Sequence, residues 1–429
     1  MQAKLRWLAP GIGVKRWLFV LLAGATLLGL GFGYVLLDLY RTVPVPDAVG
    51  VLTLQFLPRL VRAVLFGGLG VGLMAWSLNR IQQTLLAPFL RPGQDLASTL
   101  NDHRRRGRGP RIVAIGGGTG LSTLLRGLKA HTSNLTAIVT VADDGGSSGR
   151  LRETLGVLPP GDFRNCIAAL ADDESLTTQL FQYRFGSGEG LGGHSFGNLF
   201  ITAMTEVAGS FERALLESSR VLAIQGQVLP STLQDVTLVG ELAMAGQQVS
   251  RVEGETQIAE REGAIQRVFL QPDDAPAFPG AIRALLEAEL IVLGPGSLYT
   301  SLLPNLLVRD LTNAIAASRA RKVYVCNTAT QPGETDGYSV RDHVLAIERH
   351  TRTGLFPIVL ANSRHEGKLL PGLEWVALDP PLNGARRVIT ADLADAEHPW
   401  RHDSAKVAAT LINLLAQSEA ERPTAEPVS

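Results

Sequence analysis

The chain has 429 residues, and its 40 lysines and arginines are balanced by 40 aspartates and glutamates. A net charge of zero gives no global field that would attract nucleic acid, and the two cysteines, Cys166 and Cys326, form neither a zinc pattern nor a disulfide framework. The length exceeds that of one average domain, and the cysteine usage indicates a reducing compartment.

Two apolar runs near the N-terminus predict a hairpin of two membrane spans. Residues 17–37 contain no charged side chain, and at about 1.5 Å per helical residue they are long enough to cross a bilayer core of roughly 30 Å. A second, shorter run gives a span at about 58–78, with Arg59 and Arg62 near its start. A signal peptide for the first run and a soluble or interfacial helix for the second remain alternatives.

Basic residues flank the predicted hairpin on both outer sides. Lysines and arginines occur within residues 4–16 and again within 80–108, whereas the loop between the spans holds fewer. The positive-inside rule therefore predicts a cell-membrane protein whose soluble domain lies in the cytoplasm. The arginine-rich run at 104–108 fits an anionic-lipid contact or a solvated linker better than nucleic acid, so no nucleic-acid partner is expected.

The remaining chain predicts an α/β domain at 110–417, after a hairpin and linker at 1–109 and before a disordered tail at 418–429. A strand at 111–115, a glycine loop, a helix at 121–128 and a strand at 135–141 form a βαβ unit, which implies a parallel sheet. More elements follow: strands at 290–293, 323–327 and 357–362, a β-rich insertion within 236–270, and an amphipathic helix at 404–417.

The first glycine loop is a candidate phosphate-binding site, because glycines admit an anion close to the backbone and the next helix offers free N–H groups. The residues concerned are Gly116, Gly117, Gly118, Thr119 and Gly120. Leu121 replaces the third glycine of the dinucleotide fingerprint, and no Lys-Ser/Thr pair follows, so the loop is neither that fingerprint nor a P-loop. A tight structural turn is the alternative.

Two adjacent carboxylates follow the second predicted strand. Asp143 and Asp144 lie slightly farther from the glycine loop than the acidic residue that holds ribose hydroxyls in dinucleotide folds. They could instead bind Mg²⁺ between phosphates, since oxygen ligands suit this ion. A flexible polar loop remains the third interpretation.

Two more segments combine glycine with polar side chains at a predicted helix start. The first holds Asp162 and Asn165, with Arg164 between them, although Asp162 as a simple helix cap would explain the pattern equally. The second holds His194 and Asn198 in a glycine-rich setting. A lone histidine is more often structural than catalytic, and the sequence reveals no Ser-His-Asp arrangement.

A last glycine loop, with Gly294, Gly296 and Ser297, follows a predicted strand and is a candidate second phosphate cradle or again a turn. Ligands of open α/β sheets bind at the carboxyl ends of the strands. The convergence of several glycine-rich loops on that edge is stronger evidence for a ligand site than any one loop.

Six motifs in order resemble the YvcK/CofD superfamily over about residues 111–415: GGGTGLS (116–122), ADDGGSSGRLR (142–152), LPPGDFRN (158–165), HSFGNL (194–199), LPSTLQDVTL (229–238) and GPGSLYTSLLPNLL (294–307). The long fifth motif and the length of the soluble part are more similar to the YvcK gluconeogenesis-factor branch, in the form with an N-terminal membrane segment.

The resemblance implies a Rossmann-like three-layer domain that binds a UDP-sugar such as UDP-N-acetylglucosamine and supports cell shape and wall synthesis. Wall-synthesis proteins and a second copy of the chain are the expected partners. Mapped by motif, the first glycine loop would contact phosphates, and Asp143 and Asp144 would lie near an acceptor or Mg²⁺, with Asp144 the metal candidate. The nucleotide pocket would be completed by Asp162, Asn165, His194, Asn198, Gly294, Gly296 and Ser297.

Two functions follow from the resemblance. The first is a membrane-anchored regulator that binds a nucleotide sugar. The alternative is a Mg²⁺-dependent 2-phospho-L-lactate transferase of the CofD type, which moves a phospho-acid group from a nucleotide diphosphate to an alcohol. The acidic pair and the anion loops fit either, so the sequence leaves open whether the protein is an enzyme.

Overall fold

The computed structural model describes residues 24–27, 29, 33, 54, 56–86, 105–171, 176–188, 190–243, 249–261, 263–378 and 386–420. The chain divides into two compact units, Met1–Arg105 and Arg106–Ser429. Most of the first predicted span, at 17–37, and most of the predicted tail, at 418–429, lie outside the described residues.

The described part of the first unit is dominated by one long helix, α3 (Arg59–Leu86). An 18-residue window within it, Leu60–Ser77, has a mean hydropathy of 1.6 and no buried residue. By length and composition this helix could cross a membrane, and it overlaps the second predicted span. The two-span hairpin as a whole stays a prediction.

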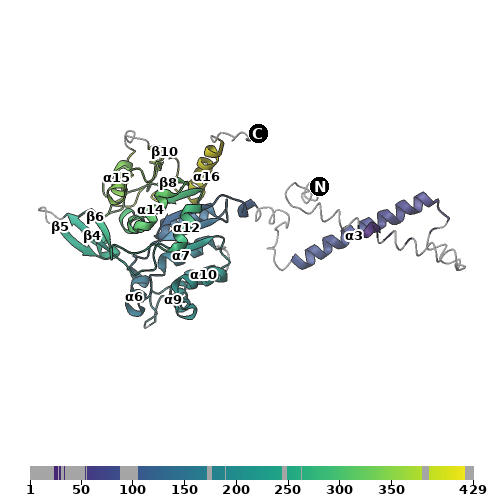
Figure 1. Ribbon diagram of the computed structural model, residues 1–429, viewed down its shortest axis with the longest axis horizontal. Coiled ribbons are helices and arrows are strands. Elements are labelled where there is room, and N and C mark those ends of the chain that lie inside the picture. The colour runs from purple at the N-terminus through teal and green to yellow at the C-terminus, as the bar shows by residue number, and fades with distance from the viewer. Residues whose placement is uncertain are drawn as a thin grey trace. The chain divides into compact units, whose positions relative to one another are not determined.

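The second unit is built on a parallel sheet, as the sequence predicted, and this sheet has seven strands (Figure 1). Its strand order is β10-β9-β8-β7-β1-β2-β3. The strands are β1 (Ile112–Gly116), β2 (Leu135–Val139), β3 (Gln227–Pro230), β7 (Leu290–Leu293), β8 (Arg321–Val325), β9 (Ile358–Asn362) and β10 (Arg387–Ala391).

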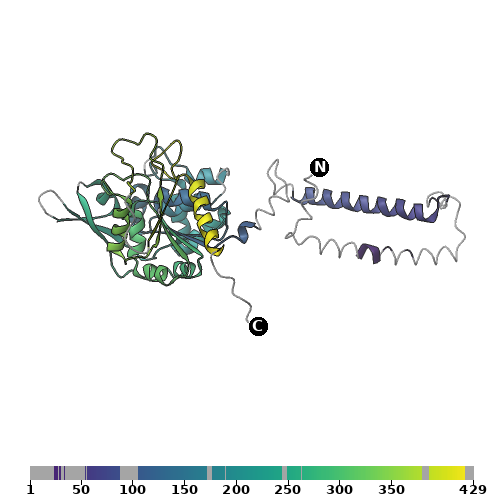
Figure 2. The ribbon, with the colours of Figure 1, turned by 90° about the horizontal axis from the view of Figure 1, so that it is seen from above.

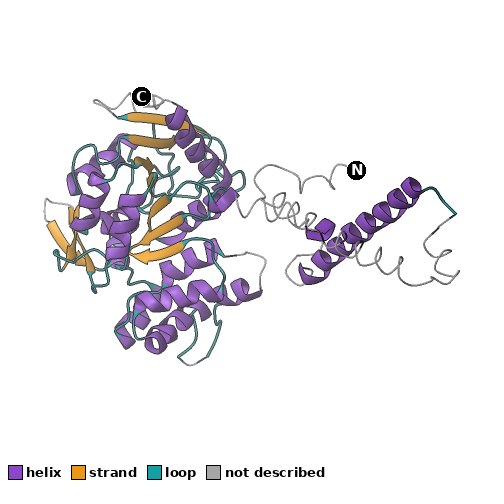
Figure 3. Ribbon diagram, turned by 45° about the vertical axis from the view of Figure 1, so that its right-hand side comes forward, coloured by secondary structure: helices purple, strands orange, loops and turns teal. Residues whose placement is uncertain are grey.

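The central strands are buried along their whole length, which is why they read as continuous apolar runs rather than alternating ones. The chain moves from β1 to β2 and β3 in one direction, and from β7 to β8, β9 and β10 in the other. Right-handed crossovers on opposite sides of this reversal place helices on both faces of the sheet (Figure 3).

The helices that cover the sheet pack in groups, with α5 against α7 and α16, and α12 against α14. The backbone of α5 approaches α16 so closely at Gly127 that a Cβ atom there would collide with the Ser404 carbonyl. The bounds are α5 (Gly118–Leu128), α7 (Gly161–Leu170), α12 (Pro279–Glu287), α13 (Leu303–Leu307), α14 (Arg309–Ala317), α15 (Val340–His350) and α16 (Ser404–Ala420), with a π-helical turn at Leu298–Leu302 before α13.

Two insertions extend this frame. Helices α6 (Gly146–Leu155), α8 (Leu176–Gln182), α9 (Phe196–Ala208) and α10 (Phe211–Val221) join α7 between β2 and β3. The predicted β-rich insertion is an antiparallel sheet of β4 (Thr237–Ala243), β5 (Val249–Glu253) and β6 (Ala264–Gln271), with the short helix α11 (Glu255–Glu260). Figures 1 and 2 both place this small sheet at one end of the unit, away from α16 (yellow).

Candidate functional site

The first and last predicted glycine loops meet at the point where the strand order reverses. β1 and β7 are neighbours, and Gly117–Gly120 and Gly294–Ser297 follow their carboxyl ends. The two backbones touch, because a Cβ atom on Gly120 would collide with the Pro295 carbonyl. Gly118 begins α5 at a φ of +62°, which favours glycine. Open α/β sheets bind ligands at this kind of reversal.

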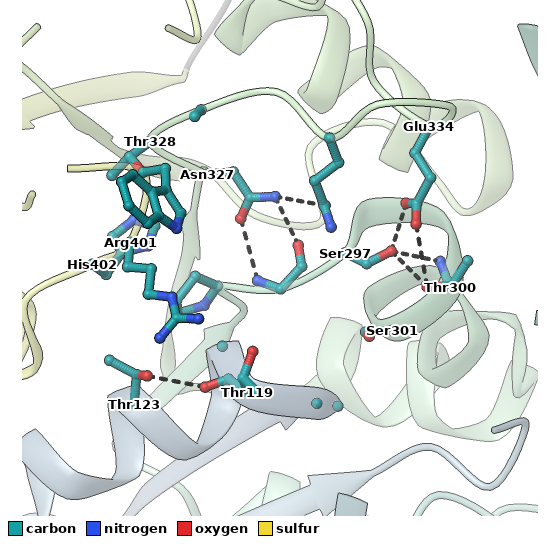
Figure 4. Close-up of a pocket in the computed structure, with 18 of the residues that line it drawn as sticks. Thr119, Thr123, Ser297, Thr300, Ser301, Asn327, Thr328, Glu334, Arg401 and His402 are labelled. Atoms are coloured by element: carbon teal, nitrogen blue, oxygen red, sulfur yellow. Dashed lines mark hydrogen bonds between the residues drawn. The ribbon is translucent and has the colours of Figure 1, made fainter. Parts of the chain in front are cut away.

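The two loops form one side of a cavity of about 410 Å³ (Figure 4). Of the predicted residues, Gly117, Gly118, Thr119, Gly120, Gly296 and Ser297 line it. Gly117, the N-cap of α5, has no side chain to cap the helix, so the first turn of α5 presents backbone atoms to the cavity. Free N–H groups and the positive end of the helix dipole favour an anion there.

The second loop is held by a buried glutamate, Glu334, which was not predicted from the sequence. The Glu334 carboxylate accepts hydrogen bonds from Ser297 Oγ at 2.5 Å, Tyr299 N at 3.4 Å and Thr300 Oγ1 at 3.4 Å. Burial raises the pKa of Glu334, and these three donors oppose the rise. Glu334 lies in the loop after β8, so it ties the ends of two neighbouring strands together.

Asparagine side chains fix both glycine loops from behind. Asn327 accepts from Gly296 N at 3.3 Å and donates to Gly296 O at 2.9 Å. Asn305 donates to Gly116 O at 2.9 Å and to Ser301 O at 2.8 Å. Gly116 therefore ends β1 as a structural anchor for the loop, while the residues after it form the cavity wall.

Asp162 and Asp143 form an acidic pair beside the first loop. Asp162 accepts from the Gly118 N–H, and burial and then the Asp143 charge raise its pKa to about 7. The pKa of Asp143 is also raised by burial, against hydrogen bonds from Gly145 and Ser148. Glu255 lines the cavity beside them, and burial followed by the same two charges raises its pKa well above the usual value. The pair can therefore hold a proton near neutral pH.

Asp144 does not line the cavity, and neither do Asp143 and Asp162. The Oδ1 atom of Asp144 accepts from Thr256 N at 3.0 Å and Thr256 Oγ1 at 2.9 Å. These bonds fasten the start of α11, so Asp144 links the end of β2 to the β insertion. The two adjacent carboxylates thus have different surroundings, and Asp143 is the one that approaches the glycine loop through Asp162.

The remaining predicted residues form a separate polar cluster. Ser147 Oγ lies 2.9 Å from His194 Nδ1 and accepts from Asn198 Nδ2 at 2.9 Å. Burial, then Arg150 and Arg184, lower the pKa of His194. None of the three lines the cavity, and Asn165 accepts instead from Arg164 at 2.6 Å.

The far side of the cavity was not predicted from the sequence. It comes from Thr328 and from Trp400, Arg401 and His402, which precede α16. Figure 4 shows the Arg401 side chain reaching toward Thr119 and Thr123. Arg401 is exposed and has no carboxylate partner among the described residues. No motif marks this segment, although Thr328 comes directly after a predicted strand.

The described residues contain no group of three aspartate, glutamate, histidine or cysteine side chains placed to hold a metal ion. Mg²⁺ usually takes only one or two protein carboxylates and completes its shell with phosphate oxygens and water. Asp143 and Asp162 are the two carboxylates beside the first glycine loop that would supply such ligands, whereas Asp144 is bonded to the start of α11.

Comparison with known proteins places the chain in a family. The family model for 2-phospho-L-lactate transferase CofD matches residues 112–417. A protein of Nostoc sp. is 53% identical over 349 residues, covering 80% of this chain and 75% of its own length. The gluconeogenesis factor of Bacillus subtilis is 45% identical over 318 residues, covering 72% of this chain and 99% of its own.

A solved structure supports the same assignment. The crystal structure of a UPF0052 family member from Bacillus halodurans has a TM-score of 0.66 and 43% identity, covering 71% of this chain and 99% of that one. The family resemblance drawn from the six motifs is therefore confirmed. The chain belongs to the CofD/UPF0052 family, in its gluconeogenesis-factor branch.

Proposed function

We propose that this chain is a nucleotide-sugar-binding regulator that acts from the cytoplasmic face of the cell membrane on wall synthesis. The observation that carries the proposal is the cavity between the two glycine loops at the strand-order reversal. A volume of about 410 Å³ suits a small organic ligand. Its backbone-rich wall suits a diphosphate, which is the group shared by nucleotide sugars.

Charge around the cavity is consistent with such a ligand. Arg401 supplies a cation, and the first turn of α5 supplies backbone donors. Asp162 lies next to the loop, but with a pKa of about 7 it is about half protonated at neutral pH. A diphosphate would favour the protonated form further, so this carboxyl group opposes the anion less than a fully ionised one would.

Calorimetry with the full-length chain tests the ligand class. We expect saturable binding of UDP-N-acetylglucosamine, and weaker binding of NAD because Leu121 replaces the third glycine of the dinucleotide fingerprint. Saturable NAD binding without UDP-sugar binding would overturn the proposal.

A transferase is the second candidate, favoured by the Asp143–Asp162 pair and by the family model. In that reaction the acceptor oxygen would attack the phosphorus of the phospho-acid group. The bond from that phosphorus to the nucleoside monophosphate would break, and the acceptor proton would pass to the Asp143–Asp162 pair. Mg²⁺ would neutralise the phosphate charge.

Two variants separate the candidates. Asp143→Asn should abolish any Mg²⁺-dependent phospho-transfer by the full chain while nucleotide binding survives. Asp144→Asn should leave most turnover intact, because Asp144 is bonded to Thr256 and is not part of the Asp143–Asp162 pair. If the wild-type chain shows no phospho-transfer with a nucleotide diphosphate ester, the regulator stands. Turnover that Asp143→Asn removes would establish the transferase.

Membrane anchoring is a separate part of the proposal. It is supported by the uncharged run at 17–37 and by the apolar exposed surface of α3, where Leu60 is 79% and Leu69 is 61% exposed. Reporter fusions at Gly50 and Gly93 should report opposite sides of the membrane. The same side for both fusions would exclude the hairpin.

A further inference from the structure

The cavity has a second end that differs in chemistry from the glycine loops. Thr328 comes from the loop after β8, and Trp400 and His402 from the segment before α16. In Figure 4, Thr328 and His402 lie together on one side of the cavity, with Ser297 and Glu334 on the opposite side. Apart from Arg401, whose side chain reaches toward Thr119 and Thr123, this end has aromatic and neutral polar side chains, whereas the glycine-loop end is rich in backbone.

Thr328 carries a buried hydroxyl group without a partner. The residue is 1% exposed, and among the described residues nothing hydrogen-bonds to its Oγ1. Its backbone carbonyl accepts from Val376 N at 3.2 Å, so the residue itself is fixed in place. Buried polar groups are nearly always paired, and because Thr328 lines the cavity, the missing partner can be a water or a ligand atom bound there.

His402 presents one defined acceptor. Its Nε2 lies 3.1 Å from the Cys326 carbonyl, which accepts only, so Nε2 must carry the proton. Burial lowers the pKa of His402 to about 4, so the ring is neutral at physiological pH. Nδ1 is therefore unprotonated, and the ring can accept a hydrogen bond but not donate a second one.

Trp400 supplies a flat apolar face. It is half-buried, lines the cavity, and is held edge-on by His398 with the ring centroids 5.2 Å apart. Aromatic rings of this kind stack with nucleobases in many nucleotide sites. Leu373, which also lines the cavity, adds an apolar neighbour.

We propose that Thr328, Trp400 and His402 form a nucleobase subsite for a base with a ring N–H beside a carbonyl, as uracil has. The base would stack on Trp400, the Thr328 hydroxyl would donate to the carbonyl, and the ring N–H would donate to His402 Nδ1. This inference rests on the proposed nucleotide-sugar function, whose diphosphate would occupy the glycine loops.

Three probes test the subsite by calorimetry on the full-length chain with Mg²⁺: uridine diphosphate, its N3-methyl analogue and inorganic diphosphate. The analogue keeps the phosphates and the ring but lacks the N–H that His402 would accept. We expect it to bind about tenfold more weakly than uridine diphosphate to the wild-type chain. This comparison avoids replacing the buried His402.

Thr328→Val preserves the side-chain shape and removes the hydroxyl group. This substitution should weaken the binding of uridine diphosphate about five- to tenfold and leave the binding of inorganic diphosphate unchanged. Ser297→Ala, at the glycine-loop end, should weaken both probes and is the matched comparison.

The outcomes separate the two levels of the proposal. If uridine diphosphate binds but neither N3-methylation nor Thr328→Val weakens it, the base subsite is wrong while the nucleotide function stands. If Thr328→Val weakens both probes equally, the hydroxyl group is structural and the subsite is again wrong. If neither uridine diphosphate nor inorganic diphosphate binds, both the subsite and the proposed function are wrong.

Discussion

Replacing Asp162 with asparagine tests the electrostatics of the site through protein stability. Asp162 has a pKa of about 7 in the folded chain, against an ordinary value of 3.8 for an aspartate. Between these values the folded state keeps a proton that the unfolded state releases. The folded state then binds more protons, so the free energy of unfolding falls as pH rises from about 4 to 7 and stays low above that range.

The size of the effect follows from the same shift. Each pH unit within this range lowers stability by about 1.4 kcal/mol for one such group. Asparagine does not titrate, and its side-chain oxygen can still accept from the Gly118 N–H. The stability advantage of Asp162→Asn over the wild-type chain should therefore widen by about 3 kcal/mol between pH 5 and pH 8.

Urea unfolding at pH 5, 6, 7 and 8, followed by circular dichroism, measures this difference. Asp274→Asn, at an exposed carboxylate in a turn, is the matched control and should run parallel to the wild-type chain. Parallel curves for Asp162→Asn and the wild-type chain across the whole range would refute the assignment of a proton to this carboxyl group.

Three further variants test how the site is built. Gly120→Ala forces the two glycine loops apart, so uridine diphosphate affinity measured by calorimetry should fall more than tenfold, whereas Gly186→Ala, which meets nothing within 4 Å, should bind normally. Asp144→Ala removes the hydrogen-bond partner of Thr256 in α11. The opening free energy of that helix, measured by hydrogen exchange, should therefore fall by about 1.5–3 kcal/mol; unchanged exchange would contradict the anchoring role of Asp144. Glu334→Gln places an amide among three donors, and equal loss of affinity for uridine diphosphate and inorganic diphosphate would match its role in holding the loop.

The central part of the fold was readable from the sequence because buried parallel strands give unbroken apolar runs. The strands around 112–116 and 290–293 and the glycine loops after them were predicted, and so was the convergence of those loops on one sheet edge. β3 was missed because it has four residues and ends in proline, and β10 because, as an edge strand, it is mostly only partly buried.

About the candidate site, the sequence predicted the glycine loops but not the segments that face them. Motif reading identifies a loop that follows a strand, but not which distant segment faces it. Asp143 and Asp144 are adjacent, and the family resemblance made Asp144 the metal candidate, yet in the fold Asp144 is bonded to Thr256 and Asp143 lies beside Asp162. Glu334 and His402 stand in segments without a motif, and only the folded sheet brings them to the cavity.

The pocket can be completed only late in translation, because α16 packs on α5 and His402 is bonded to the Cys326 carbonyl. The glycine loop after β1 leaves the ribosome early, but the wall it faces is supplied by residues translated almost last. A nascent chain can therefore assemble the central strands and still lack a complete pocket. Ligand capture becomes possible only when synthesis is nearly finished, so a chain cut short before Trp400 would fold its sheet edge around an open, one-sided groove.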